Sequence, residues 1–346
     1  MGNINSCTYS GGFVAGRNAV LFISRPDVMA HDDFSYGRLY TWVNGEWGHG
    51  HFPFTIASSL LSRNKTGAPP YFIYSLGLTS GAVEVSWPKG VKKEYEFLPG
   101  ASENRGIPHL QQIKEIGGCL YVVGPKSQIF RRRAEISARM TSFKGAGGKD
   151  FQGRVDQWEV FNQGVEPRSI KELQAEGMSQ GEAMSAFLSY CSLNSIDGGD
   201  EKSLYACGDD GVIIFREKDK WRFLPKVTNA DLRQVKQVDS STIYLVGDRG
   251  TLLKGNALEG FDVIPTDIGA QLRGLEWFNG KLYIGSIGRG LFVFDGVSVS
   301  RVSNLPDFVC HTLHAKEGQL LAIGEKEAFL TDDALQWHSL KNPDNL

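Results

Sequence analysis

The sequence lacks any long hydrophobic run and has almost no net charge. A transmembrane helix needs about 18 or more consecutive apolar residues, and no such run occurs among the 346 residues. The formal net charge at pH 7 is −2, so a general electrostatic attraction to nucleic acid or to anionic lipid is not expected. The N-terminus, MGNINSCTYSGG, has no basic segment followed by an apolar one, so we expect no secretory signal.

Cysteine is scarce and irregularly spaced. The five cysteines are odd in number and contain no CxxC pair, which argues against a zinc site or a disulfide framework. Three of them, Cys119, Cys191 and Cys207, lie in apolar runs, where cysteine behaves as a small buried hydrophobic residue. We therefore expect reduced thiols and a cytoplasmic location.

The short motifs of the common enzyme classes are also missing. No GxSxG, P-loop or HExxH occurs, and no GxGxxG stands between a strand and a helix. The paired carboxylates Asp209-Asp210 and Asp332-Asp333 lie in predicted turns, where aspartate is favoured for local hydrogen bonding. These absences favour a protein that is not an enzyme, and we expect no catalytic residues and no cofactor.

Two clusters of basic and imidazole side chains have simple interpretations. Arg131, Arg132 and Arg133 form the only basic run, but side chains alternate between the two faces of a strand, so they make no single patch for nucleic acid. His49 and His51 offer two imidazoles to a metal, yet no third ligand stands at a spacing that supports one. A surface turn is favoured there, and we expect no bound metal.

A repeated phrase dominates the rest of the chain. An apolar run, Gly-Asp-x-Gly and a second apolar run occur in LYACGDDGVIIFRE (204–217) and in IYLVGDRGTLLKGN (243–256). This pattern predicts a β-hairpin, because apolar runs suit buried strands and glycine supplies the positive φ of a tight turn. Gly208 and Gly247 are 39 residues apart, and related phrases lie near Gly77, Gly124, Gly285 and Gly324 and at 19–25. A period near 40 residues made of strands is typical of a propeller blade.

The repeats predict an all-β fold, a single seven-bladed β-propeller of four-stranded blades over residues 1–346. Seven whole blades close a ring and leave no long exposed sheet edge. Whether the N- and C-terminal strands share one blade stays open. The second strand of each predicted blade lies near Leu21, Phe72, Tyr121, Tyr205, Tyr244, Tyr283 and Leu321.

One interval is twice the usual length. The 84 residues between Gly124 and Gly208 correspond to two blades or to one blade with insertions, and no further copy of the phrase in the interval favours insertions. We expect a Gly-rich loop at about 142–153, between the third and fourth strands of blade three. We also expect a short helical insertion at about 167–186, between blades three and four. Pro167 suits a helix start, and Ser179 with Glu182 matches a capping box.

The repeated phrase resembles the WD40/YVTN/BNR-type superfamily of β-propellers. The turns in CGDDGVIIF and VGDRGTLL are similar to those of the Ycf48-like photosystem-assembly propellers, which are exported proteins. The resemblance covers most of the chain as a repeat pattern and is strongest from Leu204 to Leu340. The Gly-His and Trp-Asp dipeptides of true WD40 blades do not recur at the set places. The resemblance implies the fold rather than the task, because propellers serve many functions.

The first strand of each propeller blade lines a central channel, and its start lies on the same face as the turn between the second and third strands. Aligning the strand starts as apolar-polar-x-apolar places four polar residues at the channel mouth, with Thr55 and Ser189 as weaker matches. These four are Gln111, Arg233, Arg273 and His311. The turns on that face add Asp209, Asp210, Asp248, Arg249 and Arg289, together with Lys126 and Lys326.

This ring suggests a binding site, because convergent charged donors suit an acidic loop, a carboxylate or a phosphate. A channel whose walls are polar only because they are wet is the alternative. We expect the helical insertion to stand beside the mouth on the same face. The whole pattern predicts a cytoplasmic, monomeric module that binds another protein and not nucleic acid or membrane. We expect an inhibitor, an immunity-type protein that neutralises a toxin, or an assembly factor.

A carbohydrate-binding or glycoside-acting propeller is the competing hypothesis. Such a site needs aromatic stacking surfaces and, for hydrolysis, two carboxylates about 5–10 Å apart. Trp42, Trp47 and Trp277 are the candidates for stacking, but the sequence places no pair of carboxylates opposite them.

The cysteine pattern generates the first prediction. Native protein alkylated before any reduction should show five modified thiols by mass spectrometry, because all five cysteines are expected to be reduced. An intramolecular disulfide would contradict both this expectation and the cytoplasmic assignment.

Overall fold

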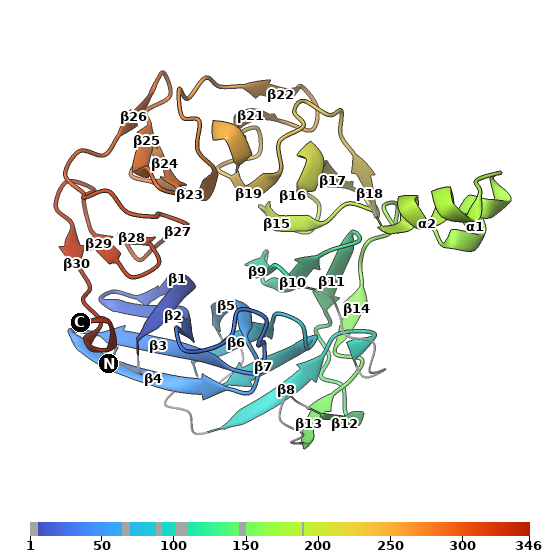
Figure 1. Cartoon of the computed structure of the whole chain (residues 1–346), viewed down its shortest axis with the longest axis horizontal. Helices are drawn as coiled ribbons and strands as arrows, with labels where there is room; N and C mark the ends of the chain where they lie inside the picture. Colours follow the sequence, from blue (N-terminus) through green and yellow to red (C-terminus); the bar gives the residue numbers. More distant parts are fainter. Residues whose placement is uncertain (1–5, 64–69, 88–91, 102–108, 145–149, 189) are drawn as a thin grey trace.

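The strands form seven sheets, of which six have four antiparallel strands and one has six strands. The computed structural model describes residues 6–63, 70–87, 92–101, 109–144, 150–188 and 190–346. Seven sheets surround a central channel, and the first and last blades lie side by side (Figure 1). The protein is a seven-bladed β-propeller, as the repeat pattern predicts.

The seven inner strands line the channel: β1 (Cys7–Gly16), β5 (Ile56–Arg63), β9 (Gln112–Ile116), β15 (Leu193–Gly198), β19 (Leu232–Gln237), β23 (Leu272–Phe278) and β27 (Thr312–Lys316). The second strands are β2 (Ala19–Pro26), β6 (Tyr71–Gly77), β10 (Cys119–Gly124), β16 (Leu204–Gly208), β20 (Ile243–Gly247), β24 (Lys281–Ser286) and β28 (Gln319–Ile323). Each second strand contains the residue from which the sequence counts its blade.

The third strands are β3 (Gly37–Val43), β7 (Ala82–Ser86), β11 (Gln128–Arg132), β17 (Ile213–Glu217), β21 (Leu252–Asn256), β25 (Gly290–Phe294) and β29 (Ala328–Thr331). The outer strands are β4 (Glu46–Phe52), β8 (Lys93–Phe97), β14 (Trp158–Val160), β18 (Lys220–Phe223), β22 (Gly260–Val263), β26 (Val299–Arg301) and β30 (His338–Ser339).

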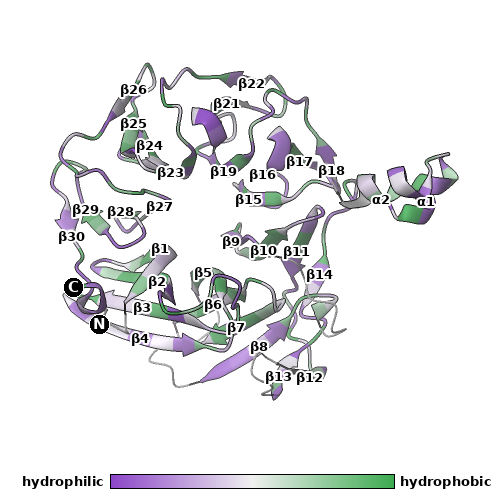
Figure 2. Cartoon of the chain, in the orientation of Figure 1, coloured by the Kyte–Doolittle hydropathy of each residue, from purple (hydrophilic) through white to green (hydrophobic). Residues whose placement is uncertain are grey.

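The second strands are continuously apolar because each sheet is buried on both faces between two neighbours. Every residue of β16, β20 and β28 is buried. The core lies between blades: Tyr205 and Cys207 of blade four pack in one cluster with Leu232 and Val235 of blade five. Outer strands such as β4 and β30 are largely exposed, and β30 is hydrophilic in Figure 2. Burial on two faces explains why these strands read as apolar runs rather than as alternating patterns.

The Gly-Asp-x-Gly turns need their second glycine for two reasons. Gly211 and Gly250 have φ of 70° and 69°, a region that side chains rarely adopt. A Cβ atom on Gly250 would lie 1.5 Å from the carbonyl oxygen of Ile268, and one on Gly211 would lie 1.8 Å from that of Thr228. Both carbonyls belong to the loop that enters the next blade, so the turn glycine sets how closely adjacent blades approach.

Side chains of the inner strands bond to the backbone of the neighbouring inner strand. The residues involved differ, but each contact joins two adjacent blades near the channel. The contacts are Gln112 Oε1 with Ile196 N at 2.8 Å, Ser195 Oγ with Val235 N at 3.3 Å, Gln234 Nε2 with Leu275 O at 3.1 Å, and His314 Nδ1 with Val14 N at 3.2 Å.

The Gly-rich stretch expected as a loop contains a second hairpin instead. Strands β12 (Met140–Lys144) and β13 (Asp150–Arg154) pair with each other, while 145–149 lies outside the described residues. β13 then joins the outer edge of blade two, where Arg154 stands opposite Glu96 in a parallel bridge. The loop interpretation was wrong for the two arms of the stretch, because β13 pairs with the open edge of β8 and β12 pairs with β13.

The helical insertion consists of α1 (Ile170–Ala175) and α2 (Gln180–Leu188). The capping box predicted at α2 is present, since Ser179 and Glu182 exchange side-chain-to-backbone hydrogen bonds of 2.9 and 3.3 Å. Pro167 precedes the α1 cap, Ser169, and therefore is not the first helical residue. The two helices project sideways from the circumference between blades three and four (Figure 1), not beside the channel mouth as expected.

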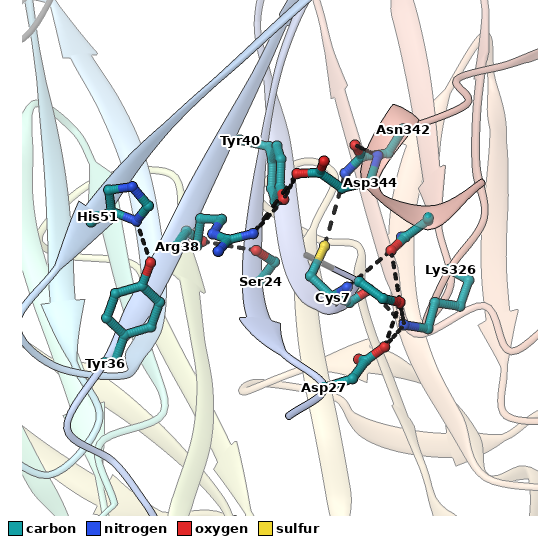
Figure 3. A network of polar contacts seen from close by, with 12 residues as sticks. Cys7, Ser24, Asp27, Tyr36, Arg38, Tyr40, His51, Lys326, Asn342 and Asp344 are labelled. Carbon is teal, nitrogen blue, oxygen red and sulfur yellow. Dashed lines mark hydrogen bonds and ion pairs between the residues drawn. The ribbon is translucent and has the colours of Figure 1, made fainter. Parts of the chain in front are cut away.

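The ring closes without a shared blade, because blade one uses β1–β4 and blade seven uses β27–β30. A C-terminal clasp joins them (Figure 3): Asn345 Oδ1 accepts from Cys7 N at 3.0 Å, and Asp344 Oδ2 accepts from the hydroxyl of Tyr40 at 2.5 Å. Lys326 donates to the carbonyl oxygen of Cys7 at 2.8 Å. Side-chain contacts thus close the ring here, whereas propellers with a shared blade close it by strand exchange.

The five cysteines are free. In the part of the chain that the structure describes, no helix combines the length and the hydrophobicity that crossing a membrane requires.

Removing the carboxylate of the clasp should destabilise the ring. In Asp344→Ala the hydroxyl of Tyr40 and the buried guanidinium of Arg38, 3.8 Å from Asp344, lose an acceptor. We expect the free energy of unfolding to fall by about 1–3 kcal/mol in urea titrations. The matched control is Asp307→Ala, which removes an exposed ion pair with Arg301 and should cost less than about 1 kcal/mol. Equal losses in the two variants would show that the clasp does not hold the ring.

Candidate binding site at the channel mouth

The central channel is the larger of the two cavities described for the molecule, with a volume of about 910 Å³. Its lining includes residues from both ends of the inner strands, such as Arg233 and Arg273 at one end and Lys114 and Lys316 at the other. The channel therefore runs through the ring. The end at which the inner strands begin is called the mouth below.

A β-bulge at the start of five inner strands creates the mouth. Each register shift leaves one residue unpaired: Ser10, Ala57, Asn194, Arg233 and Arg273. Gln111 and His311 directly precede β9 and β27 and hold the corresponding places in blades three and seven. These seven residues all line the cavity and are named the mouth ring.

The sequence alignment places the four strongest mouth residues correctly and misses the other three. It names no residue for blade one, where Ser10 lies. Ala57 and Asn194 occupy the positions assigned to Thr55 and Ser189, and Ser189 lies outside the described residues. The segment LNSI (193–196) has the same apolar-polar-x-apolar pattern as LRQV (232–235), so the signal for Asn194 was present.

Arg233 is held by three carboxylates. Its guanidinium binds Asp248 in a bidentate pair at 3.0 and 2.8 Å, Asp231 at 2.9 Å and Asp209 at 3.5 Å. The hydrogen bonds to Asp248 raise the pKa of Arg233, and those from Arg233 lower the pKa of Asp248. Arg233 is therefore a structural cation that closes the turns of two blades, and it is not available to an incoming anion.

Arg273 occupies the same place in blade six but has a different environment. The backbone N–H groups of Asp248 and Ile287 make equivalent hydrogen bonds, to the carbonyls of Asp231 and Gln271, so Ile287 stands where blade five has its aspartate. Within the described residues, no hydrogen bond or ion pair of Arg273 is found. Desolvation by the channel walls and the charge of Arg233 lower the pKa of Arg273. Its side chain is nevertheless exposed.

His311 is the other mouth residue with an unused polar atom. Its Nδ1 lies 2.9 Å from the hydroxyl of Thr312, and its buried Nε2 has no hydrogen-bond partner. Burial and the charge of Arg273 lower the pKa of His311 to about 4, with the carbonyls of Gly324 and Tyr9 acting in the opposite direction. The imidazole is thus neutral at pH 7.

The turn residues surround this ring. Asp210, Arg249 and Arg289 are exposed tips, of which Asp210 pairs with Lys226 at 2.9 Å. Asp209 accepts from Asn194 at 2.9 Å, so it also belongs to the network around Arg233. Gln111 is exposed and donates to the carbonyl of His109 at 3.1 Å. Asp231, which the sequence analysis did not single out, bonds to both Arg233 and the backbone of Asp210.

A second cavity, of about 590 Å³, lies between blades one and seven. Trp42 and Trp47, two of the proposed stacking residues, line it. Asp332 is the only carboxylate in its lining, and it is bonded to Gln319 at 2.8 Å. This arrangement lacks the carboxylate pair of a glycosidase.

The described residues contain no group of three or more side chains suited to a metal ion. His49 and His51 lie with their ring centres 4.9 Å apart on β4, and the second also contacts the hydroxyl of Tyr36.

The architecture is that of the WD40-like β-propellers, and solved structures agree. No protein-family model matches the chain. The WD40 β-propeller domain of Doa1 superimposes with a TM-score of 0.63 at 10% identity, over 96% of this chain and 97% of that one. Ycf48 from Cyanidioschyzon merolae gives 0.59 at 12% identity, over 94% of each chain. Ycf48 bound to D1 peptide gives 0.58 at 10% identity, over 94% of this chain and 91% of that one.

A characterised relative is similar in sequence as well. The immune protein Tsi7 of Pseudomonas aeruginosa is 25% identical over 249 residues, which cover 70% of this chain and 68% of that protein.

The buried imidazole of His314 should make stability depend on pH. Burial lowers its pKa to about 3, and its Nδ1 must stay unprotonated to accept from Val14 N. Unfolding restores a pKa near the usual ~6.5, so the unfolded state binds more protons below that pH. Stability is therefore complete above about pH 6.5 and falls as the pH drops toward 3.

The matching variant is His314→Asn, which keeps an acceptor for Val14 N and removes the titration. Between pH 6 and 4 its unfolding free energy in urea should fall less steeply than that of the wild type, by up to ~1.4 kcal/mol per pH unit. His338→Asn, at an exposed position, should keep the wild-type slope. An unchanged slope in His314→Asn would contradict the assignment.

Proposed function

We propose that this propeller is an immunity-type protein that binds and neutralises a partner protein in the cytoplasm, acting as a monomer. The main support for this proposal is the similarity over 249 residues to an immune protein, combined with a rigid charged face on this fold. A fold that presents side chains on rigid turns and channel walls suits binding, because these side chains lose little conformational freedom on association.

The mouth face is the proposed contact surface. Arg249 and Asp210, each at φ near 57°, are the tips of turns whose flanking glycines fit tightly against neighbouring carbonyls. These tips carry charge of opposite sign, and Arg289 adds a third exposed charge. Mixed charges on a preorganised surface select one complementary partner and disfavour polyanions in general.

The helices at the circumference lie apart from this face. They offer a second, peripheral contact to a partner large enough to reach over the edge of blades three and four (Figure 1). An assembly-factor role, by analogy with Ycf48 bound to D1 peptide, uses the same kind of surface and differs in the consequence of binding.

The test begins with the partner that purified protein captures from its source cells. Expressed alone in a host, that partner should arrest growth, and co-expression of this chain should restore it. Binding without any toxicity to neutralise would overturn the immunity role and favour an assembly factor.

Charge reversal should locate the contact face. Arg249→Glu combined with Arg289→Glu should weaken the complex at least about tenfold, equivalent to ~1.4 kcal/mol, in calorimetric titrations. The matched control reverses Arg17, in the turn between β1 and β2, and Lys281, the first residue of β24, which both lie on the opposite face. If the control pair weakens the complex as much as the first pair, the mouth face is not the contact surface.

A further inference from the structure

Blades five and six have nearly the same mouth but differ in one residue. In LRQV and LRGL the arginine is the bulged residue of its inner strand, and in both blades it points into the same cavity. Arg233 meets Asp248 in the turn of its own blade, whereas the turn of blade six carries Ile287 there. The repeat thus keeps the arginine in blade six and removes its intramolecular carboxylate.

The adjacent blade seven places a buried imidazole, that of His311, at the mouth. Nε2 of His311 is buried at the mouth without a hydrogen-bond partner, and an unsatisfied buried polar atom costs about 1–3 kcal/mol. Arg273 and His311 are close enough for the charge of Arg273 to affect the imidazole. The imidazole of His311 therefore responds to any change in the charge around Arg273, which is exposed at the mouth.

Charge and shape restrict the chemistry of that group. An unpaired guanidinium selects an anion and binds planar carboxylates in a bidentate manner, as Arg233 already does with Asp248. The three carboxylates around Arg233 outnumber the two mouth arginines, so a dianion such as phosphate or sulfate meets more repulsion than a monoanion. A single carboxylate repeats in blade six the contact that the chain makes internally in blade five.

We propose that Arg273 binds one carboxylate group at the channel mouth, beside His311. Arg273 supplies the charged fork, and the buried imidazole of His311 lies near enough to sense the charge that this fork meets. The carboxylate comes from an aspartate or glutamate side chain of the partner protein or from a free small carboxylate. The first of these sources rests on the proposed function.

Arg273 is accessible because its side chain is exposed and the mouth ring is uneven. Ser10 and Ala57, in blades one and two, are small, while the long side chains belong to blades three and five to seven. Ser10 lies in the blade next to His311, so the channel stays open on that side. A loop that carries an acidic side chain can enter there.

The first test uses the purified protein with small probes. The chain has seven histidines, and the ring signal of ¹³C-labelled His311 is followed by NMR at pH 7 and constant sodium concentration. Sodium acetate and the peptide acetyl-Gly-Glu-Gly-amide are titrated in place of chloride. The controls are sodium sulfate and the corresponding Gln peptide.

We expect a saturable shift with a carboxylate probe and none with the Gln peptide or sulfate. Arg273→Gln should weaken the response at least tenfold, whereas Lys316→Gln, at the opposite end of the same channel, should leave it unchanged. A response to acetate alone identifies a free carboxylate as the ligand, and a response to the Glu peptide identifies an acidic side chain. No saturable shift, or an equal shift in Arg273→Gln, overturns the site.

The second test uses the complex with the captured partner. Arg273→Gln should lower its affinity about 10–100-fold, because it removes a charge-assisted contact, and Arg273→Lys should restore part of the loss. If Arg273→Gln abolishes the acetate response but leaves the partner affinity unchanged, the partner is not the source of the carboxylate. That result leaves the proposed function standing, whereas failure of partner capture leaves the acetate test intact.

Discussion

Seven sheets must meet around one channel, and the contacts between their inner strands are the constraint on which the rest of the structure depends. At several blade junctions an inner strand bonds to its neighbour through side chains such as Gln112, Ser195 and His314, and not through a continuous sheet. These bonds differ in chemistry from blade to blade but occupy the same layer. The ring therefore tolerates sequence variation between blades while it keeps the bulged residues of the mouth in register.

The mouth illustrates how a repeated fold produces an asymmetric site. The bulge recurs in five blades and presents one side chain each time, so the backbone supplies position and the residue supplies chemistry. In blade five that side chain is neutralised within the protein by Asp248, and in blade six it is not. A departure from the repeat can therefore leave a polar group without its internal partner, as Ile287 does for Arg273.

The periphery carries the elements that break the repeat. The β12–β13 hairpin extends blade two at its outer edge, and the helices project between blades three and four. The clasp formed by Asn342, Asp344 and Asn345 holds blade seven to blade one. All three additions leave the mouth uncovered, which is consistent with a face that meets a partner.

The sequence alone determined the fold, because a 39-residue period of apolar runs and Gly-Asp-x-Gly turns is a local signal repeated often enough to count blades. It also determined that Gln111, Arg233, Arg273 and His311 share one end of the channel, since equivalent positions in a repeat occupy equivalent places. Only the tertiary structure decided which of them are free. Arg233 pairs with Asp231, two residues away, and also with Asp209, which lies in another blade. Whether a charge is paired therefore depends on distances between blades, which no local sequence pattern encodes. The pairing of β13 with β8 and the closure by Asp344 were decided there too, because both join segments far apart in the chain.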